Sequence, residues 1–216
     1  TAAIRRVRRH LLAWGRANFQ HFPWRSETDP WRSLVAELLL QRTRAAQVEP
    51  VFRQFCRDYP TAEDLARAGE AAATRIMLHL GLRWRGRLLH VTARAVYERG
   101  GTPPESLEDL RSLPGVGPYT AAAWLSLHRG QRSVMIDSNV GRWLSRVTGK
   151  PYARDPRHVH WVKDLADRLT PRRGFRDYNY AVLDFTMHVC TPRAPRCPKC
   201  PLRRSCFYGR AHGTAS

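Results

Sequence analysis

Residues 113–147 read LPGVGPYTAAAWLSLHRGQRSVMIDSNVGRWLSRV, and the rest of the chain is organised around them. Two short helical patterns flank a turn with glycines at 115 and 117, where the missing Cβ atoms allow a tight bend and a close approach to a partner. Pro118 suits the first turn of a helix, where its missing N–H costs nothing. The free N–H groups at the start of a helix can bind a phosphate. The stretch therefore predicts a binding site for a DNA backbone, with the acid Asp137 a short distance further along the chain.

The composition narrows the class of protein. Hydrophobic residues make up 43% of the 216 residues, which is enough for a globular core and argues against disorder. The chain carries 37 Lys and Arg against 18 Asp and Glu, a net charge of +19. This excess predicts a polyanionic partner, first of all nucleic acid, although an arginine-rich composition from a high-GC genome or a solvated face would give the same charge.

The sequence gives no sign of a membrane span or a secretory signal. It has no stretch of about 18 apolar residues, and its basic N-terminus lacks a long apolar core. Four of the five cysteines crowd into residues 190–206, which favours metal ligation in a reducing compartment over a disulfide framework. We therefore expect a cytoplasmic monomer that acts on nucleic acid and not on a membrane.

The pattern of apolar residues predicts a series of short helices with no internal repeat. Asp29 and Thr61 are the expected helix caps, and Thr61 forms a capping box with Asp64. An alternating strand pattern occurs only at residues 133–136, so we expect an all-α fold with two helical lobes. The expected helices cover residues 4–20, 30–43, 45–57, 61–65, 70–80, 86–99, 105–112, 155–169 and 175–189.

Glu37 interrupts the apolar run VAELLL at residues 35–40. Helical spacing places it on one face with Leu34 and Gln41. The acid lies either on the solvent face, or in the interior in a chemical role. Burial would raise the pKa of its carboxyl group and let it hold a proton near neutrality.

The turn LRWRGR at residues 82–87 is dense in arginine. Such a turn can contact phosphates and push an apolar residue, here Leu82, into a base stack. It is equally typical of a solvated helix start with Leu82 and Trp84 in the core. The sequence leaves both interpretations open.

A compact set of cysteines follows the spacing C-x6-C-x2-C-x5-C. Soft thiolates favour iron–sulfur clusters or zinc. Zinc ribbons usually present two C-x2-C pairs, whereas this loop has one pair with unequal flanks, which favours a [4Fe–4S] cluster. The fifth cysteine, Cys56, lies on an apolar helical face and is expected to be a small core residue. The set consists of Cys190, Cys197, Cys200 and Cys206.

Together these motifs resemble the helix-hairpin-helix DNA glycosylases with a C-terminal iron–sulfur loop, the endonuclease III and MutY-like superfamily. The resemblance covers roughly residues 5–210 and rests on LPGVGPYTA, MIDSNVGR, AELLLQRT and the cysteine loop. It implies a central helical domain, residues 21–132, with the helix-hairpin-helix at about 105–128. Residues 1–20 and 133–216 would form a second domain that holds the cluster, with DNA in the cleft between the two domains.

The resemblance also implies catalytic roles for two acids. Asp137 matches the family's catalytic aspartate, a role that suits a carboxylate because cleavage of an N-glycosidic bond builds positive charge on the sugar. Asp137 also suits the N-cap of the helix that follows it, and both roles can coexist. Glu37 matches the glutamate that protonates the leaving base in adenine glycosylases, and is expected to contact the flipped base or an attacking water.

Two groups of residues are expected to bind DNA. The hairpin would do so through Gly115, Val116, Gly117, Tyr119 and Thr120. Gln41, Arg42 and Leu82 match positions that fill the gap or read the estranged base, and Arg83 is an expected contact beside Leu82. The target base must leave the stack, because its glycosidic bond is unreachable within the duplex.

Position 119 sorts the chemistry within this superfamily. Bifunctional members carry a lysine there, whose amine attacks C1′ and leads to strand cleavage; the phenol of Tyr119 cannot form a Schiff base. Tyr119 is therefore expected to sit against the flipped nucleotide in an enzyme that leaves an abasic site. Adenine-removing members typically have a serine there. The tyrosine, with AELLLQRT and RDYNYAVLDF, is most similar to archaeal-type mismatch glycosylases, which remove thymine or uracil opposite guanine.

The expected substrate is therefore duplex DNA with a T·G or U·G mispair, and the active site needs no cofactor of its own. The chain ends soon after the cysteine loop, without the extra domain that adenine glycosylases use to inspect 8-oxoguanine. One alternative is adenine removal opposite guanine or 8-oxoguanine, which Glu37 supports. The other is a DNA-damage-binding protein without catalysis.

Overall fold

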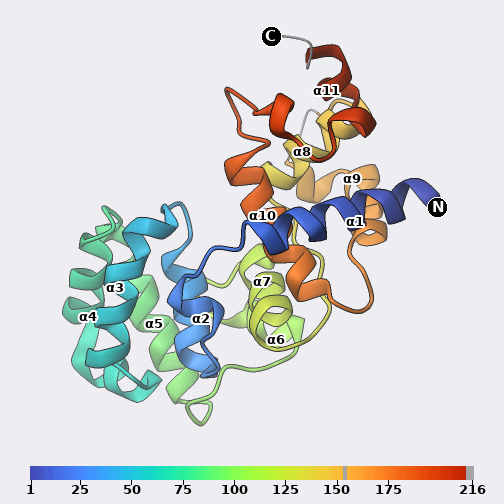
Figure 1. Ribbon diagram of the computed structural model, residues 1–216. Coiled ribbons are helices and arrows are strands. Elements are labelled where there is room, and N and C mark those ends of the chain that lie inside the picture. Colours follow the sequence, from blue (N-terminus) through green and yellow to red (C-terminus); the bar gives the residue numbers. More distant parts are fainter. Residues whose placement is uncertain (153–154, 213–216) are drawn as a thin grey trace. The chain divides into compact units, whose positions relative to one another are not determined.

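The computed structural model describes residues 1–152 and 155–212, and this part of the chain forms helices and no strands, which confirms the all-α prediction (Figure 1). None of the described helices is long and apolar enough to cross a membrane. The chain forms two compact units, which we name the hairpin unit, His21–Gln131, and the terminal unit, Thr1–Gln20 with Arg132–Ser216. The α-helices are α1 Ala2–Ala17, α2 Pro30–Leu39, α3 Ala45–Asp58, α4 Ala62–Leu78, α5 Gly86–Tyr97, α6 Leu107–Ser112, α7 Pro118–His128, α8 Ser138–Thr148, α9 His160–Leu169, α10 Phe175–His188 and α11 Phe207–His212. Five short 3-10 turns are η1 Pro23–Arg25, η2 Arg83–Arg85, η3 Pro156–His158, η4 Cys197–Lys199 and η5 Arg203–Ser205.

The hairpin unit packs α2 to α7 around one hydrophobic core. Leu34, Phe55 and Trp124 are among its fully buried side chains. The indole Nε1–H of Trp124 on α7 donates to the Ser33 hydroxyl oxygen on α2 at 3.0 Å, which ties the two helices together. This packing holds α2 and α7 in fixed register, so side chains one turn further along face each other.

Two helix boundaries in the hairpin unit depend on local chemistry. Asp29 accepts the N–H of Arg32 at 2.8 Å, and α2 begins at Pro30 as expected. The helix ends at Leu39, however, and the prediction that it runs to residue 43 is wrong. Residues 40–43 form a turn in which Arg42 adopts a left-handed φ of 63°, a conformation that side chains disfavour and tertiary contacts must stabilise.

Helix α4 shows both an expected start and an expected interruption. Thr61 and Asp64 form the predicted capping box at its N-terminus. The two helices expected over residues 61–80 are joined across Gly69, whose φ of 82° is not helical. A glycine takes this backbone conformation without a Cβ penalty.

The terminal unit packs α1 against α10, residues far apart in the sequence. A Cβ on Gly15 of α1 would lie 2.4 Å from Cβ of Ala181 on α10, so glycine is needed for this close crossing. Trp14 meets Phe185 edge to face, with ring centroids 5.7 Å apart. The expectation of one helix over residues 155–169 is wrong, because Asp155 caps a separate 3-10 turn and the extended Val159 separates that turn from α9.

Candidate active site

The hairpin motif consists of α6, the turn at residues 113–117, and α7. Gly115 has a φ of 80°, and a Cβ there would lie 2.9 Å from Cγ of Leu88. Gly117 caps α7 and Pro118 is its first residue; both are exposed, so the start of this helix faces solvent. The side chain of Val116 is buried, so any contact this residue makes with DNA comes from its backbone.

Gln41 braces this turn from inside the hairpin unit. Its side-chain Nε2 donates to the carbonyl of Gly115 at 3.1 Å and to the Thr120 hydroxyl at 2.9 Å. Arg85 in turn donates from its guanidinium to the side-chain and main-chain oxygens of Gln41. The amide of Gln41 and the buried hydroxyl of Thr120 are thus engaged within the protein, and Gln41 lies in the turn that follows α2.

Arg85 is a part of this site that the sequence analysis missed. It is buried, and burial together with the nearby charge of Arg42 lowers the pKa of its guanidinium. The sequence shows an arginine-dense turn, but its pattern does not tell which arginine points inward. Only the tertiary structure shows that Arg85 supports Gln41.

The other residues of the arginine turn divide between surface and core. Arg83 and Trp84 are exposed, and Trp84 retains 67% of its accessible area with Arg85 over its ring at 5.5 Å. The interpretation that places Trp84 in the core is therefore wrong. Leu82 is half-buried and packs partly against the core of the hairpin unit. Arg42, at the tip of its strained turn, is exposed.

Glu37 is buried on α2, and its carboxylate has a partner that the sequence did not indicate. Its Oε1 lies 3.0 Å from Nε2 of His128, the last residue of α7, and the two side chains are 8% and 1% exposed. Of the two interpretations, the solvent-facing one is wrong. Residues 37 and 128 are 91 positions apart, so no local pattern could pair them. Tyr119 lies half-buried in the first turn of the same helix α7.

Asp137 lies in the terminal unit, at the N-terminus of α8. Its Oδ1 accepts the Val140 N–H at 2.8 Å, which confirms the expected N-cap, and its Oδ2 accepts Nδ2 of Asn139 at 2.8 Å. Arg142 donates to the Asn139 side-chain oxygen at 2.9 Å and also to the carbonyl of Cys190. A continuous chain of hydrogen bonds therefore links Asp137 to the first cysteine of the loop.

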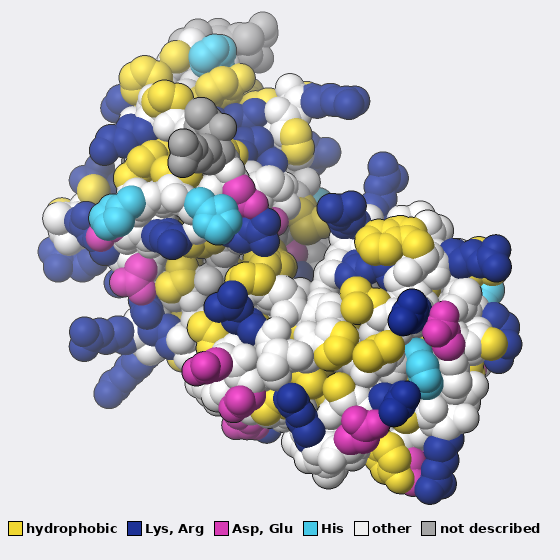
Figure 2. Space-filling model, turned by 180° about the vertical axis from the view of Figure 1, so that it is seen from behind, with side chains coloured by type: hydrophobic (Ala, Val, Ile, Leu, Met, Phe, Trp, Pro, Cys, Tyr) yellow, Lys and Arg dark blue, Asp and Glu magenta, His cyan; other side chains and the backbone are white. Residues whose placement is uncertain are grey.

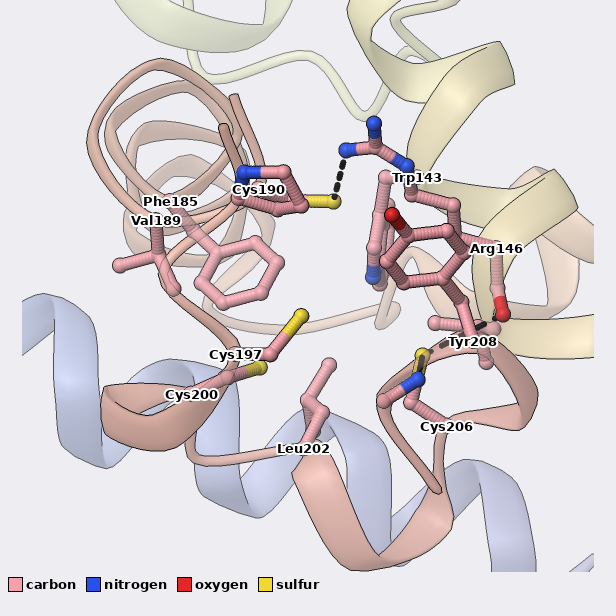
Figure 3. Close-up of a pocket in the computed structure, with 13 residues that line it drawn as sticks. Trp143, Arg146, Phe185, Val189, Cys190, Cys197, Cys200, Leu202, Cys206 and Tyr208 are labelled. Atoms are coloured by element: carbon pink, nitrogen blue, oxygen red, sulfur yellow. Dashed lines mark hydrogen bonds between the residues drawn. The ribbon is translucent and has the colours of Figure 1, made fainter. Parts of the chain in front are cut away.

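The four cysteines of the loop line one pocket, together with aromatic and aliphatic side chains of α8 and α10 (Figure 3). The pocket holds about 330 Å³ of space free of protein atoms, part of it open to solvent. Burial raises the pKa of the Cys197 and Cys206 thiols, and that of Cys200 to about 12. Metal ligation requires the thiolate, so a metal group bound here would displace the protons of these thiols.

The donor set is four cysteine thiols around one pocket, and soft thiolates suit zinc or an iron–sulfur cluster. Zinc needs its four ligands within about 2.3 Å of one centre, whereas an iron–sulfur cluster takes four thiolates around a larger group. Within the described residues, no group of three His, Cys, Asp or Glu side chains is gathered closely enough to hold one metal ion.

Cations surround the cysteine loop. Arg146 donates to the carbonyls of Thr191 at 2.6 Å and Pro192 at 2.8 Å, and its Nη1 lies 3.5 Å from Sγ of Cys190. No Asp or Glu follows Asp184 in the chain. Figure 2 shows Lys and Arg side chains over much of the drawn surface, with Asp and Glu more scattered. This field attracts a polyanion.

Comparisons with known proteins agree with these motifs. The sequence matches the model of the HhH-GPD superfamily base excision DNA repair proteins over residues 35–160. A thymine-DNA glycosylase of Aeropyrum pernix is 37% identical over 213 residues, 95% of each chain. A thymine/uracil-DNA glycosylase of Methanothermobacter thermautotrophicus is 32% identical over 92% of this chain and 90% of the relative. An adenine DNA glycosylase of Rattus norvegicus is 35% identical over 98% of this chain, but only 42% of that protein.

Solved structures give the same result. A thermostable thymine-DNA glycosylase matches with a TM-score of 0.90 and 31% identity, over 97% of this chain and 98% of that one. An endonuclease III–DNA covalent intermediate matches with a TM-score of 0.79 over 95% and 96%; at 22% identity this shows a shared fold. The family resemblance predicted from the motifs is thereby confirmed. The chain belongs to the HhH-GPD superfamily of base excision DNA repair proteins.

Proposed function

We propose that this chain is a monofunctional DNA N-glycosylase that releases thymine or uracil mispaired with guanine in duplex DNA. The observation that carries the proposal is the buried, hydrogen-bonded carboxylate of Glu37 beside a hairpin with Tyr119, in a chain 37% identical to a thymine-DNA glycosylase over 95% of its length. The positive charge and the exposed start of α7 support a DNA backbone as the partner.

Asp137 supplies the negative charge that this reaction needs. As the bond between C1′ and the base nitrogen breaks, its electron pair leaves with the base and positive charge develops on the sugar. An ionised Asp137 stabilises that charge, and water then forms the new bond to C1′ and loses a proton, which the departing base anion takes up. The Val140 N–H and the Asn139 amide fix the carboxylate in place.

Glu37 and Tyr119 act on the flipped nucleotide itself. We assign Glu37 to contact with the flipped base or with the attacking water. The Tyr119 phenol occupies the position where an amine would attack C1′, so the enzyme leaves an intact strand with an abasic site.

We further propose that Cys190, Cys197, Cys200 and Cys206 hold a [4Fe–4S] cluster. When bound, the cluster cross-links residues 190–206 and so fixes the cations of this loop against a phosphate backbone. The groups that act on the nucleotide all come from the chain itself.

A panel of duplexes tests the proposal. Under single-turnover conditions, T·G and U·G duplexes should lose their pyrimidine, and the strand should break only after alkali. Release of adenine alone from A·G or A·8-oxoguanine would replace the assignment with the adenine activity that several relatives carry. Tight binding without release of any base would instead indicate a damage-binding protein.

A further inference from the structure

The strongest feature that the proposed mechanism does not use is His128, the partner of Glu37. Both side chains are buried in the hairpin unit, and both come from helices rather than loops. They lie one helical turn beyond a second cross-helix hydrogen bond, from Trp124 Nε1–H to the Ser33 hydroxyl. Two hydrogen bonds, one helical turn apart, thus join α7 to α2. The carboxylate of Glu37 takes part in the second of them.

The surroundings of the imidazole determine which nitrogen carries the proton. Nδ1 of His128 is buried and has no hydrogen-bond partner among the described residues. A buried N–H without an acceptor is costly, whereas a bare ring nitrogen costs less. The tautomer that carries its proton on Nε2 is therefore favoured over the tautomer that carries it on Nδ1. In this state Nε2–H donates to Oε1 of Glu37, 3.0 Å away.

In this hydrogen bond His128 is the donor and Glu37 is the acceptor, and this direction has a chemical consequence. A donor aimed at a carboxylate oxygen stabilises the ionised carboxylate. It occupies Oε1, and within residues 1–152 and 155–212 no hydrogen bond to Oε2 is formed. The pair thus presents a fixed, anionic acceptor.

We propose that His128 is a positioning residue that holds Glu37 as an oriented carboxylate and thereby fits the site to bases that donate a hydrogen bond, thymine and uracil through N3–H, and not to adenine, which must accept a proton to leave. This inference rests on the proposed function, because it assigns the acceptor of Glu37 to the flipped base. Adenine offers ring nitrogens that are acceptors, so an ionised Glu37 without a proton to give would repel them.

The test is a double-mutant cycle with the holoenzyme on a T·G duplex. Loss of one hydrogen bond to a charged group predicts a rate for His128→Leu about 10- to 100-fold below the parent, with the Kd for DNA unchanged. His128→Gln, which retains an N–H near the position of Nε2, should recover most of this loss. Adding His128→Leu to Glu37→Gln should lower the rate no further, because His128 acts through Glu37.

The same variants test the effect on substrate choice. His128→Leu should lower the ratio of thymine release from T·G to adenine release from A·G by about tenfold or more, since Glu37 is then free to carry a proton. His90→Leu is the matched control: His90 lies on α5, and its Nδ1 also lacks a partner among the described residues, but it does not touch Glu37. We expect this control to leave both rates unchanged.

The outcomes separate the two proposals. If the parent releases thymine from T·G but His128→Leu and Glu37→Gln lower the rate independently, the role of His128 is wrong and the proposed function stands. The same holds if His128→Gln behaves like His128→Leu, or if the rate follows the thermal unfolding midpoint alone. A parent that releases no thymine from T·G overturns both.

Discussion

The Glu37 site of the hairpin unit and the cysteine loop of the terminal unit are built in opposite ways. Glu37 is nearly buried, with 8% of its side chain exposed, and His128 of α7 already holds its carboxylate in place. In the cysteine loop Arg142 and Arg146 hold the main-chain carbonyls, but the four thiols line a partly open pocket, and burial raises the pKa of Cys197, Cys200 and Cys206. The first site is complete in the polypeptide alone, and the second is built for a group that the polypeptide must acquire.

Asp137 shares a feature with each of these two sites. It is a helix cap, which the polypeptide provides, yet its hydrogen-bond chain through Asn139 and Arg142 ends at the carbonyl of Cys190. The position of the Asp137 carboxylate is therefore tied to the cysteine loop, whereas that of the Glu37 carboxylate is set by His128 within the hairpin unit.

The largest effect should come from Asp137→Asn. Asparagine is as good an N-cap as aspartate, so α8 keeps its cap while the site loses its charge. We expect the single-turnover rate on T·G to fall by about 10²- to 10³-fold, with little change in the unfolding midpoint. Asp29→Asn removes a charge from the other cap, at α2, and should leave the rate unchanged. An unchanged rate in Asp137→Asn would mean that Asp137 acts only as a cap, and an equal loss in both variants would mean that its charge has no special role.

Cys200→Ser should disrupt the cysteine loop of the terminal unit and leave the Glu37 site of the hairpin unit intact. Loss of one ligand should remove the visible absorption of the cluster and lower the free energy of unfolding of the terminal unit by more than about 2 kcal/mol. Cys56→Ser is the matched control, because Cys56 is a free cysteine packed against the core of the hairpin unit. Metal analysis that finds zinc in the parent would contradict the assignment of an iron–sulfur cluster.

The cations of the cysteine loop should have a smaller and salt-dependent effect. Arg196 is exposed beside Cys197, and Arg196→Ala should weaken DNA binding for all sequences alike. The slope of log K against log salt concentration should become shallower by about one. Arg67→Ala, which removes an exposed arginine paired with Glu63 on α4, is the control and should keep the parent slope. If both variants give the same slope, the loop does not contact phosphates.

The smallest effect is expected at a helix cap that has no role in base release. Thr61→Ala removes the capping box of α4 and should lower the free energy of unfolding by about 1 kcal/mol, measured with denaturant. The rate of base release at 25 °C should not change. A loss of rate comparable to that of Asp137→Asn would show that general stability, and not charge, governs both variants.

The features that the sequence predicted are those set by local patterns. The caps at Asp29, Thr61 and Asp137, and the break between the two parts of α4, follow from side chains within a few residues of each other. The all-α class and the family also follow from motifs of this kind. Where the predictions failed, at the end of α2 and at Val159, a distant or turn-forming contact outweighed helical periodicity.

The parts of the site that the sequence did not predict are contacts between residues far apart in the chain. Neither His128 nor Arg85 carries a local signal, because each acts on a side chain 91 or 44 positions away. The same holds for the side chain of Gln41, whose spacing placed it with Glu37 but which the structure turns toward Gly115. Whether a buried acid has a partner, and which one, is decided by packing between helices.

The most direct test of the account is a competition between two duplexes in one reaction. The holoenzyme receives equal amounts of T·G and A·G duplex under single-turnover conditions, and mass spectrometry identifies the free base. We predict that thymine is released and that both strands stay intact until alkali is added. Adenine as the released base would contradict the assignment of an anionic Glu37 site that takes a pyrimidine.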